Sequence, residues 1–180
     1  MNALAIDPGS KSLGWAHMIQ ENNRIIIVDT LELPDRMEDK YPLLYYFIRM
    51  QLEGIVVGGY KRIKPDVVVL ESFFTQSFKG TTIIPEVRGI IKLAVYQQKT
   101  VQLIEVAPGT VKKVVTGSGN AKKEDVREAI NKIYNNSPML KGISNDAIDA
   151  IAIGITGIRK MELGLEAGVK FDDNVGGERL

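Results

Sequence analysis

Residues 3–16 read ALAIDPGSKSLGWA, a stretch in which a carboxylate, Asp7, stands between two apolar runs. Residues 3–6 include no polar position, as in a strand buried on both faces, and Pro8 cannot continue a central strand. Asp7 is therefore predicted at the carboxyl end of a buried strand, where open α/β sheets bind ligands. Gly14 would let another backbone or a ligand approach closely. Asp before Pro-Gly is also an ordinary turn former, and this stretch alone leaves that role open.

The composition is that of one folded domain. The chain has 180 residues, of which 44% are hydrophobic, enough for a real core. It contains no cysteine, which excludes disulfides and thiolate metal sites and suits a reducing compartment. No segment has the pattern of a signal peptide or a membrane span, so a cytoplasmic protein without a membrane partner is expected. The net charge of +1 means that any nucleic-acid surface must be a local patch.

Apolar periodicity and turn residues predict an α/β fold, a mixed five-stranded sheet flanked by helices. Strands are expected at residues 2–7, 13–19, 24–33, 67–70 and 101–106. Helices are expected at about 36–60, from a cap at Thr81 or Thr82 to about 98, from 108 to a turn at 117–119, at 121–134, and from a Ser144 cap to about 160. The domain is assigned to residues 1–160, and the tail 161–180, which contains four glycines, is expected to be partly disordered.

Four acidic residues are candidates for one site. Asp7 and Glu71 each end a buried run, and a parallel crossover between the two strands would place both carboxylates at one mouth. Asp146 and Asp149 are spaced i, i+3 and project from one face of the last helix. The alternative for this pair is charge complementing the helix dipole, which explains one acid better than two in an Ala/Ile-rich segment.

Clustered carboxylates repel one another, so a fold that gathers them implies a cation. Oxygen ligands that leave positions for water suit Mg²⁺ or Mn²⁺. Two such ions about 3.5–4 Å apart form a recurring device for in-line phosphodiester hydrolysis. The acids therefore predict a nuclease-type metal site.

Basic and aromatic residues near these acids are candidates for DNA binding. Phe73 and Phe74 follow Glu71, and one of them could stack on opened bases, with core packing of both as the alternative. Arg88 could touch a phosphate or solvate its helix face. A basic patch that can neutralise phosphates, or else a solvated helix face, brackets the turn at 117–119. It consists of Lys112, Lys113, Lys122, Lys123 and Arg127. His17 and Trp15 are assigned to structural roles, Trp15 in the core.

Four blocks in order resemble the RuvC family of Holliday junction resolvases. The blocks are residues 5–10 (AIDPGS), 70–74 (LESFF), 111–123 (VKKVVTGSGNAKK) and 145–152 (NDAIDAIA). Each block alone is weak, but the ordered set covers nearly the whole domain. The resemblance implies a ribonuclease H-like fold, a homodimer, and magnesium-dependent symmetric nicking of four-way DNA junctions, with manganese as a substitute.

The same resemblance implies roles for single residues. Asp7, Glu71, Asp146 and Asp149 would be catalytic and would bind two metal ions per active site. Lys112 and Lys123 align with an essential basic pair, and Phe74 with a residue that stacks on unpaired bases. Lys122 departs from the family pattern, which often has an acid there.

Other functions remain open at this stage. An actin-like ATPase shares the pattern around Asp7, but that fold needs two such domains and a longer chain. A junction-binding protein without catalysis is disfavoured by four intact acids. A ribonuclease H-like nuclease that cuts flaps or other branched replication DNA, such as a phage-type enzyme, is not separated from a resolvase by the sequence.

Overall fold

A five-stranded mixed sheet with the strand order β3-β2-β1-β6-β7 forms the middle layer of the computed structural model, which describes residues 1–59, 61–72 and 83–164. The strands are β1 (Asn2–Pro8), β2 (Ser12–Ile19), β3 (Arg24–Glu32), β6 (Val67–Glu71) and β7 (Gln102–Val106). The first three pair antiparallel, whereas β1, β6 and β7 run parallel. The predicted α/β class with a mixed five-stranded sheet is confirmed.

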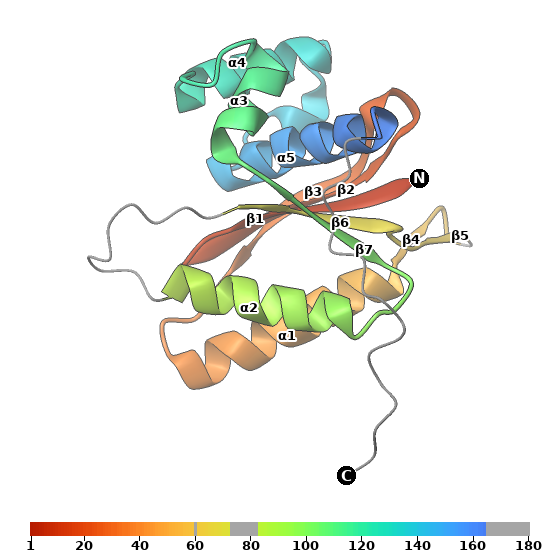
Figure 1. Cartoon of the computed structure of the whole chain (residues 1–180), viewed down its shortest axis with the longest axis vertical. Coiled ribbons are helices and arrows are strands. Elements are labelled where there is room, and N and C mark those ends of the chain that lie inside the picture. Colours follow the sequence, from red (N-terminus) through yellow and green to blue (C-terminus); the bar gives the residue numbers. More distant parts are fainter. Residues whose placement is uncertain (60, 73–82, 165–180) are drawn as a thin grey trace.

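Helices cover both faces of this sheet (Figure 1). On one face lie α1 (Met37–Glu53) and α2 (Ile83–Tyr96), and on the other lie α3 (Pro108–Thr116), α4 (Lys123–Ile133) and α5 (Asn145–Glu162). Two short 3₁₀ helices, η1 (Glu21–Asn23) and η2 (Pro138–Leu140), lie in the connections. As predicted, α3 begins at a proline and ends just before Gly117, whose φ is 85°, and α5 is capped by Ser144.

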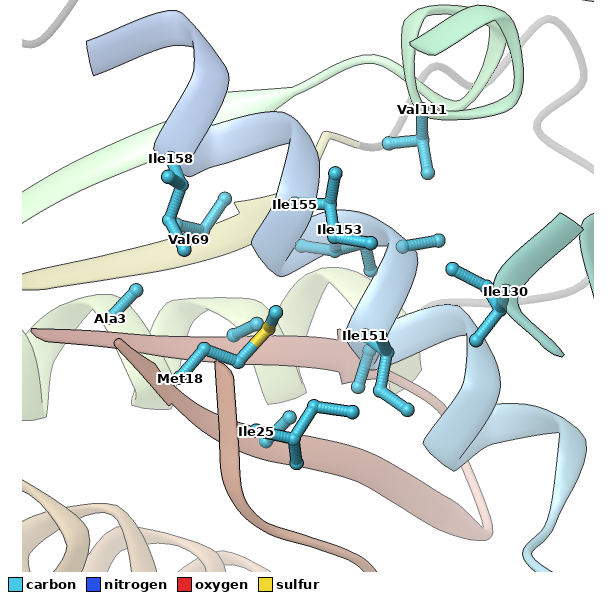
Figure 2. Packing of buried hydrophobic residues seen from close by; sticks show 14 of the residues in the cluster. Ala3, Met18, Ile25, Val69, Val111, Ile130, Ile151, Ile153, Ile155 and Ile158 are labelled. Atoms are coloured by element: carbon cyan, nitrogen blue, oxygen red, sulfur yellow. The ribbon is translucent and has the colours of Figure 1, made fainter. Parts of the chain in front are cut away.

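Side-chain alternation divides the interior into two cores. Ala5 of β1 and Val69 of β6 pack with the apolar face of α5, while Leu4 and Leu70 pack with α1 and α2. Figure 2 shows the α5 side, where the isoleucines of α5 meet residues of the sheet. Gly157 lets α5 approach closely, because a Cβ there would lie 2.3 Å from Cγ2 of Val69. The last helix is therefore held directly against the central strands.

The predicted helix over residues 36–60 is confirmed up to Glu53 and wrong beyond it. The helix α1 ends at Glu53, and Gly54 follows with φ of 91°. The chain then forms a small hairpin, separate from the main sheet, of β4 (Ile55–Val57) and β5 (Lys61–Ile63). The helical spacing of apolar residues ends before this segment, where β-branched residues and two glycines favour strands and a turn.

Other differences are confined to element ends. The helix α5 continues to Glu162, two residues past the expected domain border at 160. The predicted cap at Thr81 or Thr82 and most of the tail, residues 165–180, lie outside the described residues. Among the helices described, none is both long and apolar enough to cross a lipid bilayer.

Candidate active site

Asp7 and Glu71 lie side by side at the carboxyl ends of β1 and β6. The parallel register pairs Ile6 with Leu70, so the next residue of each strand is an acid. Asp7 and Glu71 each lie two residues after a strand residue that packs against α5, namely Ala5 and Val69, so their side chains point to the α5 face of the sheet. The two carboxylates therefore open on the same face at the same end of the sheet, as predicted.

The first turns of α5 supply Asp146 and Asp149. The Ser144 hydroxyl caps this helix by accepting a hydrogen bond of 3.0 Å from the Ala147 N–H. Gly14 of β2 pairs with Asp7, and a Cβ at Gly14 would lie 1.9 Å from the carbonyl oxygen of Asp146. Only glycine leaves room for α5 to begin directly above the sheet beside Asp7. The close approach expected at Gly14 is confirmed.

Two polar contacts, both missed by the sequence analysis, fix the turn between β1 and β2. The Ser12 hydroxyl donates a hydrogen bond to Oδ2 of Asp146. The ammonium of Lys40, a residue that is 2% exposed, donates a hydrogen bond of 2.8 Å to the carbonyl oxygen of Ser10. No sequence pattern marks Lys40 as buried, because its position on α1 reads as an ordinary charged helix residue.

The four carboxylates act on one another electrostatically. Burial, followed by the charges of Glu71, Asp149 and Asp146, raises the pKa of Asp7 to about 8. Burial also raises the pKa of Glu71 and of Asp149, and each of these two has a further carboxylate beside it that adds to the effect. Because the raised pKa values show that ionisation of these acids is unfavourable here, a positive charge nearby would stabilise their ionised form.

Lys123 and Lys112 provide such charge within the protein. Nζ of Lys123, the first residue of α4, lies 3.4 Å from Oδ2 of Asp149, and this carboxylate raises the pKa of Lys123. The charge of Lys112, on α3, lowers the pKa of both Glu71 and Asp149 against the effect of burial. The structure thus brings these two members of the predicted basic patch to the acids.

The other members of the basic patch lie elsewhere. Lys113 and Lys122 are exposed, Lys122 at the start of α4. The guanidinium of Arg127 donates hydrogen bonds of 2.8 Å to Oδ1 of Asn145 and 3.1 Å to the carbonyl oxygen of Ile143. Arg127 therefore braces the segment that leads into α5.

Arg88 is not a solvated residue, in contrast to one of its two expected roles. It is 7% exposed, and its guanidinium forms an ion pair with Glu105 of β7. Phe73 and Phe74 lie outside the described residues. The structural roles of His17 and Trp15 are confirmed, since both are buried and Nε2 of His17 lies 3.0 Å from Oε1 of Gln51.

The donor set suits a hard divalent cation, although the side chains as they stand do not enclose one. Within the described parts of the chain, no three acidic or histidine side chains are arranged to hold a metal ion. The gathered donors are four carboxylates whose mutual repulsion an ion would relieve. Carboxylate-only ligation of this kind fits Mg²⁺ or Mn²⁺ better than Zn²⁺, which prefers nitrogen and sulfur.

The sheet order and the acids at two neighbouring strand ends and on the last helix define a ribonuclease H-like fold. Residues 3–157 match the family model described as crossover junction endodeoxyribonuclease RuvC, so the chain belongs to this family.

Relatives with the same description agree in length and sequence. The chain is 31% identical to the protein of Brachyspira hyodysenteriae over 156 residues, which cover 86% of this chain and 92% of the relative. It is 33% identical over 157 residues to that of Caldanaerobacter subterraneus subsp. tengcongensis, covering 86% and 90%.

Solved structures show the same fold. The Thermus thermophilus RuvC structure superposes with a TM-score of 0.72 at 20% identity and covers 91% of this chain and 97% of that one. A structure of T. thermophilus RuvC in complex with a Holliday junction substrate has a TM-score of 0.76 at 18% identity, covering 94% and 99%. The expected ribonuclease H-like fold class is confirmed.

Proposed function

We propose that this chain is a metal-dependent endonuclease that resolves four-way DNA junctions by paired, symmetric nicks. The observation that carries the proposal is the meeting of Asp7, Glu71, Asp146 and Asp149 at one end of the sheet, with Lys112 and Lys123 beside them, in a member of the RuvC family. The curated relatives carry the same enzyme name and are covered over at least nine-tenths of their length.

The four acids are the proposed ligands of two ions per active site. Magnesium, with manganese as a substitute, would supply positive charge at the scissile phosphate and activate the attacking water. Ser12 orients the Asp146 carboxylate through its hydrogen bond, and Gly14 places the start of α5 close enough for Asp146 to join Asp7. The four acids are each only partly exposed, so the electrostatic interactions made there are stronger than in bulk water.

The proposed DNA contacts surround these acids. Lys112 and Lys123 are close enough to act on the carboxylates and would meet the phosphate that is cut. The exposed Lys113 and Lys122 would contact phosphates further along the arms. Phe74, with Phe73 beside it, is proposed from the family position to stack on unpaired bases at the crossover. Arg88 is not retained as a direct DNA contact because it is buried.

We propose that two copies act together, because each chain supplies one site and a symmetric junction needs two nicks. The outer surface of α1 and α2, on the sheet face opposite α5, is the proposed interface (Figure 1). Large apolar side chains are exposed there, with Tyr46 at 67%, Met50 at 68% and Leu93 at 53%. Cellular DNA as the substrate would place the protein in the cytoplasm.

The test compares cleavage of a synthetic four-way junction, a flap and a linear duplex in magnesium. We expect paired nicks at symmetric positions in the junction and little cleavage of the other two substrates. Asp7→Asn and Asp146→Asn should lose cleavage while junction binding in calcium persists, because removing negative charge relieves repulsion of phosphates. A preference for the flap, or near-normal nicking by either variant, would overturn the proposal.

A further inference from the structure

Lys40 is a buried cation at the same end of the sheet as the acids. It lies in the first turn of α1 and is 2% exposed. Its ammonium donates a hydrogen bond of 2.8 Å to the carbonyl oxygen of Ser10 and forms no ion pair with any residue that the structure describes. Lysine is almost never buried to this degree without a charged partner, because the charge loses its hydration. Packing alone therefore does not account for a lysine at this position.

The turn that Lys40 contacts connects β1 to β2 and has little room to deform. A Cβ at Gly9 would lie 2.1 Å from the carbonyl oxygen of Ser12. On the other side of the turn, the Leu33 N–H donates a hydrogen bond of 2.8 Å to the carbonyl oxygen of Lys11. A displacement at Ser10 would therefore be passed on to Ser12, two residues further along the chain.

The same turn is joined to the candidate active site on the other face of the sheet. The Ser12 hydroxyl donates a hydrogen bond to Oδ2 of Asp146, in the first turn of α5. The helices α1 and α5 cover opposite faces of the sheet (Figure 1). Two hydrogen bonds and the short backbone between Ser10 and Ser12 thus connect the Lys40 ammonium to the Asp146 carboxylate.

A buried ammonium is suited to holding this turn. A hydrogen bond from a charged donor is stronger than one between neutral groups. Phosphates compete for the charge of an exposed lysine when DNA binds, whereas a buried lysine is out of their reach. Lys11, in the same turn, is exposed and open to such competition. Lys40 can therefore hold the Ser10 carbonyl in the same way before and after the substrate binds.

We propose that Lys40 is a positioning residue for Asp146. Its ammonium fixes the turn between β1 and β2, and the fixed turn lets Ser12 hold the Asp146 carboxylate in the candidate active site. This inference rests on the proposed function, in which Asp146 is a metal ligand. The competing explanation is that Lys40 only fastens α1 to the sheet, and that the carboxylate keeps its place without it.

Gln51 provides a matched control. It is also buried on α1, at 8% exposure, and its Oε1 lies 3.0 Å from Nε2 of His17 on β2. It follows Lys40 by about three helical turns, toward the end of α1 away from the acids. Gln51→Met therefore removes a buried polar contact between α1 and the sheet without touching the turn that Lys40 holds.

The experiment measures single-turnover cleavage of a four-way junction at saturating protein and magnesium. Lys40→Met should reduce the rate by about 10- to 100-fold, as loss of a residue that orients a metal ligand does, and Gln51→Met should keep the wild-type rate. Ser12→Ala should also slow cleavage. The double variant Lys40→Met/Ser12→Ala should cut no more slowly than the slower single variant, because both changes interrupt the same connection to Asp146.

Magnesium binding gives a second readout that does not depend on cleavage. Magnesium should raise the unfolding temperature of Lys40→Met less than that of the wild-type protein, because a displaced Asp146 holds the ion less tightly, and Gln51→Met should respond like the wild type. The unfolding temperature without metal does not decide the matter, since an apolar side chain in place of a buried charge can be neutral or stabilising.

Three results would overturn the proposal. These are equal cleavage rates for folded Lys40→Met and Gln51→Met, rate losses that multiply in the double variant, and a wild-type response of Lys40→Met to magnesium. If Lys40→Met does not fold, Lys40→Gln, whose amide stops short of the Ser10 carbonyl, supplies the same comparisons. A folded wild-type protein that does not cut junctions would overturn the proposed function instead, while the response to magnesium would still test the role of Lys40.

Discussion

Gly14 lies directly beneath the first turn of α5, where a Cβ would be 1.9 Å from the Asp146 carbonyl oxygen and 2.9 Å from the Ala147 nitrogen. Both neighbours are backbone atoms, so they cannot rotate away as a side chain could. The same glycine pairs with Asp7 in the β1–β2 register. The absence of a side chain at Gly14 therefore sets how close Asp146 on α5 lies to Asp7 on β1.

Gly14→Ala should displace the start of α5 and reduce both stability and cleavage. We expect the free energy of unfolding to fall by about 1–3 kcal/mol, as in other overpacked sites. A shift of about 1 Å at Asp146 should reduce the cleavage rate by roughly 10²-fold. Gly109→Ala is the matched control, because a Cβ there meets nothing within 4 Å. Chemical denaturation and single-turnover cleavage measure the two effects, and a Gly14→Ala protein as active as the control would contradict this account.

The sequence predicted the position of each acid more reliably than the contacts that hold it. Asp7 and Glu71 were found because a continuous apolar run that ends in an acid marks the end of a buried strand. Asp146 and Asp149 were found from helical spacing. Ser12 and the partners of Arg88 were missed, because these contacts join residues far apart in the chain, Ser12 to Asp146 and Arg88 to Glu105. Periodicity carries no information about such pairs.

The hairpin of β4 and β5 shows a second limit of sequence reasoning. The apolar spacing in α1 predicted a helix that would continue to about residue 60. Gly54, with φ of 91°, ends it at Glu53, and the next residues pair as strands. A glycine inside an apparently helical pattern is ambiguous, because it can either be tolerated within a helix or end it. Here the β-branched residues and the two glycines after Gly54 favour a hairpin, and the pairing of β4 with β5 confirms it.

Burial of Asp7, together with repulsion from the neighbouring acids, should make the metal-free protein less stable as the pH rises. The pKa of Asp7 is about 8 in the folded protein, well above its ordinary value of 3.8, so between these values the native state binds more protons than the unfolded state. The stability contributed by protonated Asp7 is present below about pH 4 and is lost as the pH approaches 8. Asp7→Asn cannot ionise and should therefore be the more stable protein at pH 8, by about 1–3 kcal/mol.

Urea unfolding of the wild-type protein and of Asp7→Asn in a chelator, from pH 5 to pH 8.5, checks this dependence. The difference between the two proteins should grow with pH, and magnesium at pH 8 should stabilise the wild-type protein more than the variant. A stability difference between the two proteins that does not change over this pH range would show that Asp7 is ionised throughout, and would contradict the prediction.

Lys123 should contribute to both DNA binding and cleavage. Its Nζ lies 3.4 Å from Asp149, and its side chain is 64% exposed, so the ammonium can move from the carboxylate to a phosphate. Lys123→Gln should weaken junction binding, reduce the slope of log affinity against log salt by about 1, and slow cleavage at saturating DNA. Lys132→Gln is the matched control, since Lys132 lies on the same helix and pairs at 2.6 Å with Glu128 on the surface. An unchanged salt slope for Lys123→Gln would remove Lys123 from the DNA-binding surface.

Charge placed on the outer surface of α1 should separate the two copies of the proposed dimer. Met50 is 68% exposed on α1, so Met50→Glu should leave the fold of one chain intact while disfavouring burial of this surface against a second copy. Sedimentation at micromolar concentration should show a dimer for the wild-type protein and a monomer for the variant. The monomer should still nick one strand of a junction, because Asp7, Glu71, Asp146 and Asp149 belong to a single chain, but it should lose the pairing of the two nicks.

Met139→Glu is the control for this prediction. Met139 is also an exposed methionine, at 48%, but it belongs to η2, outside the helices of the proposed interface. The Met139→Glu protein should remain dimeric and make paired nicks. The readout is a supercoiled plasmid that carries a cruciform, because paired nicking of this plasmid gives a linear product and single nicking gives an open circle. A wild-type protein that sediments as a monomer and still linearises the plasmid would rule out the dimer, and a dimeric Met50→Glu would move the interface away from the outer surface of α1.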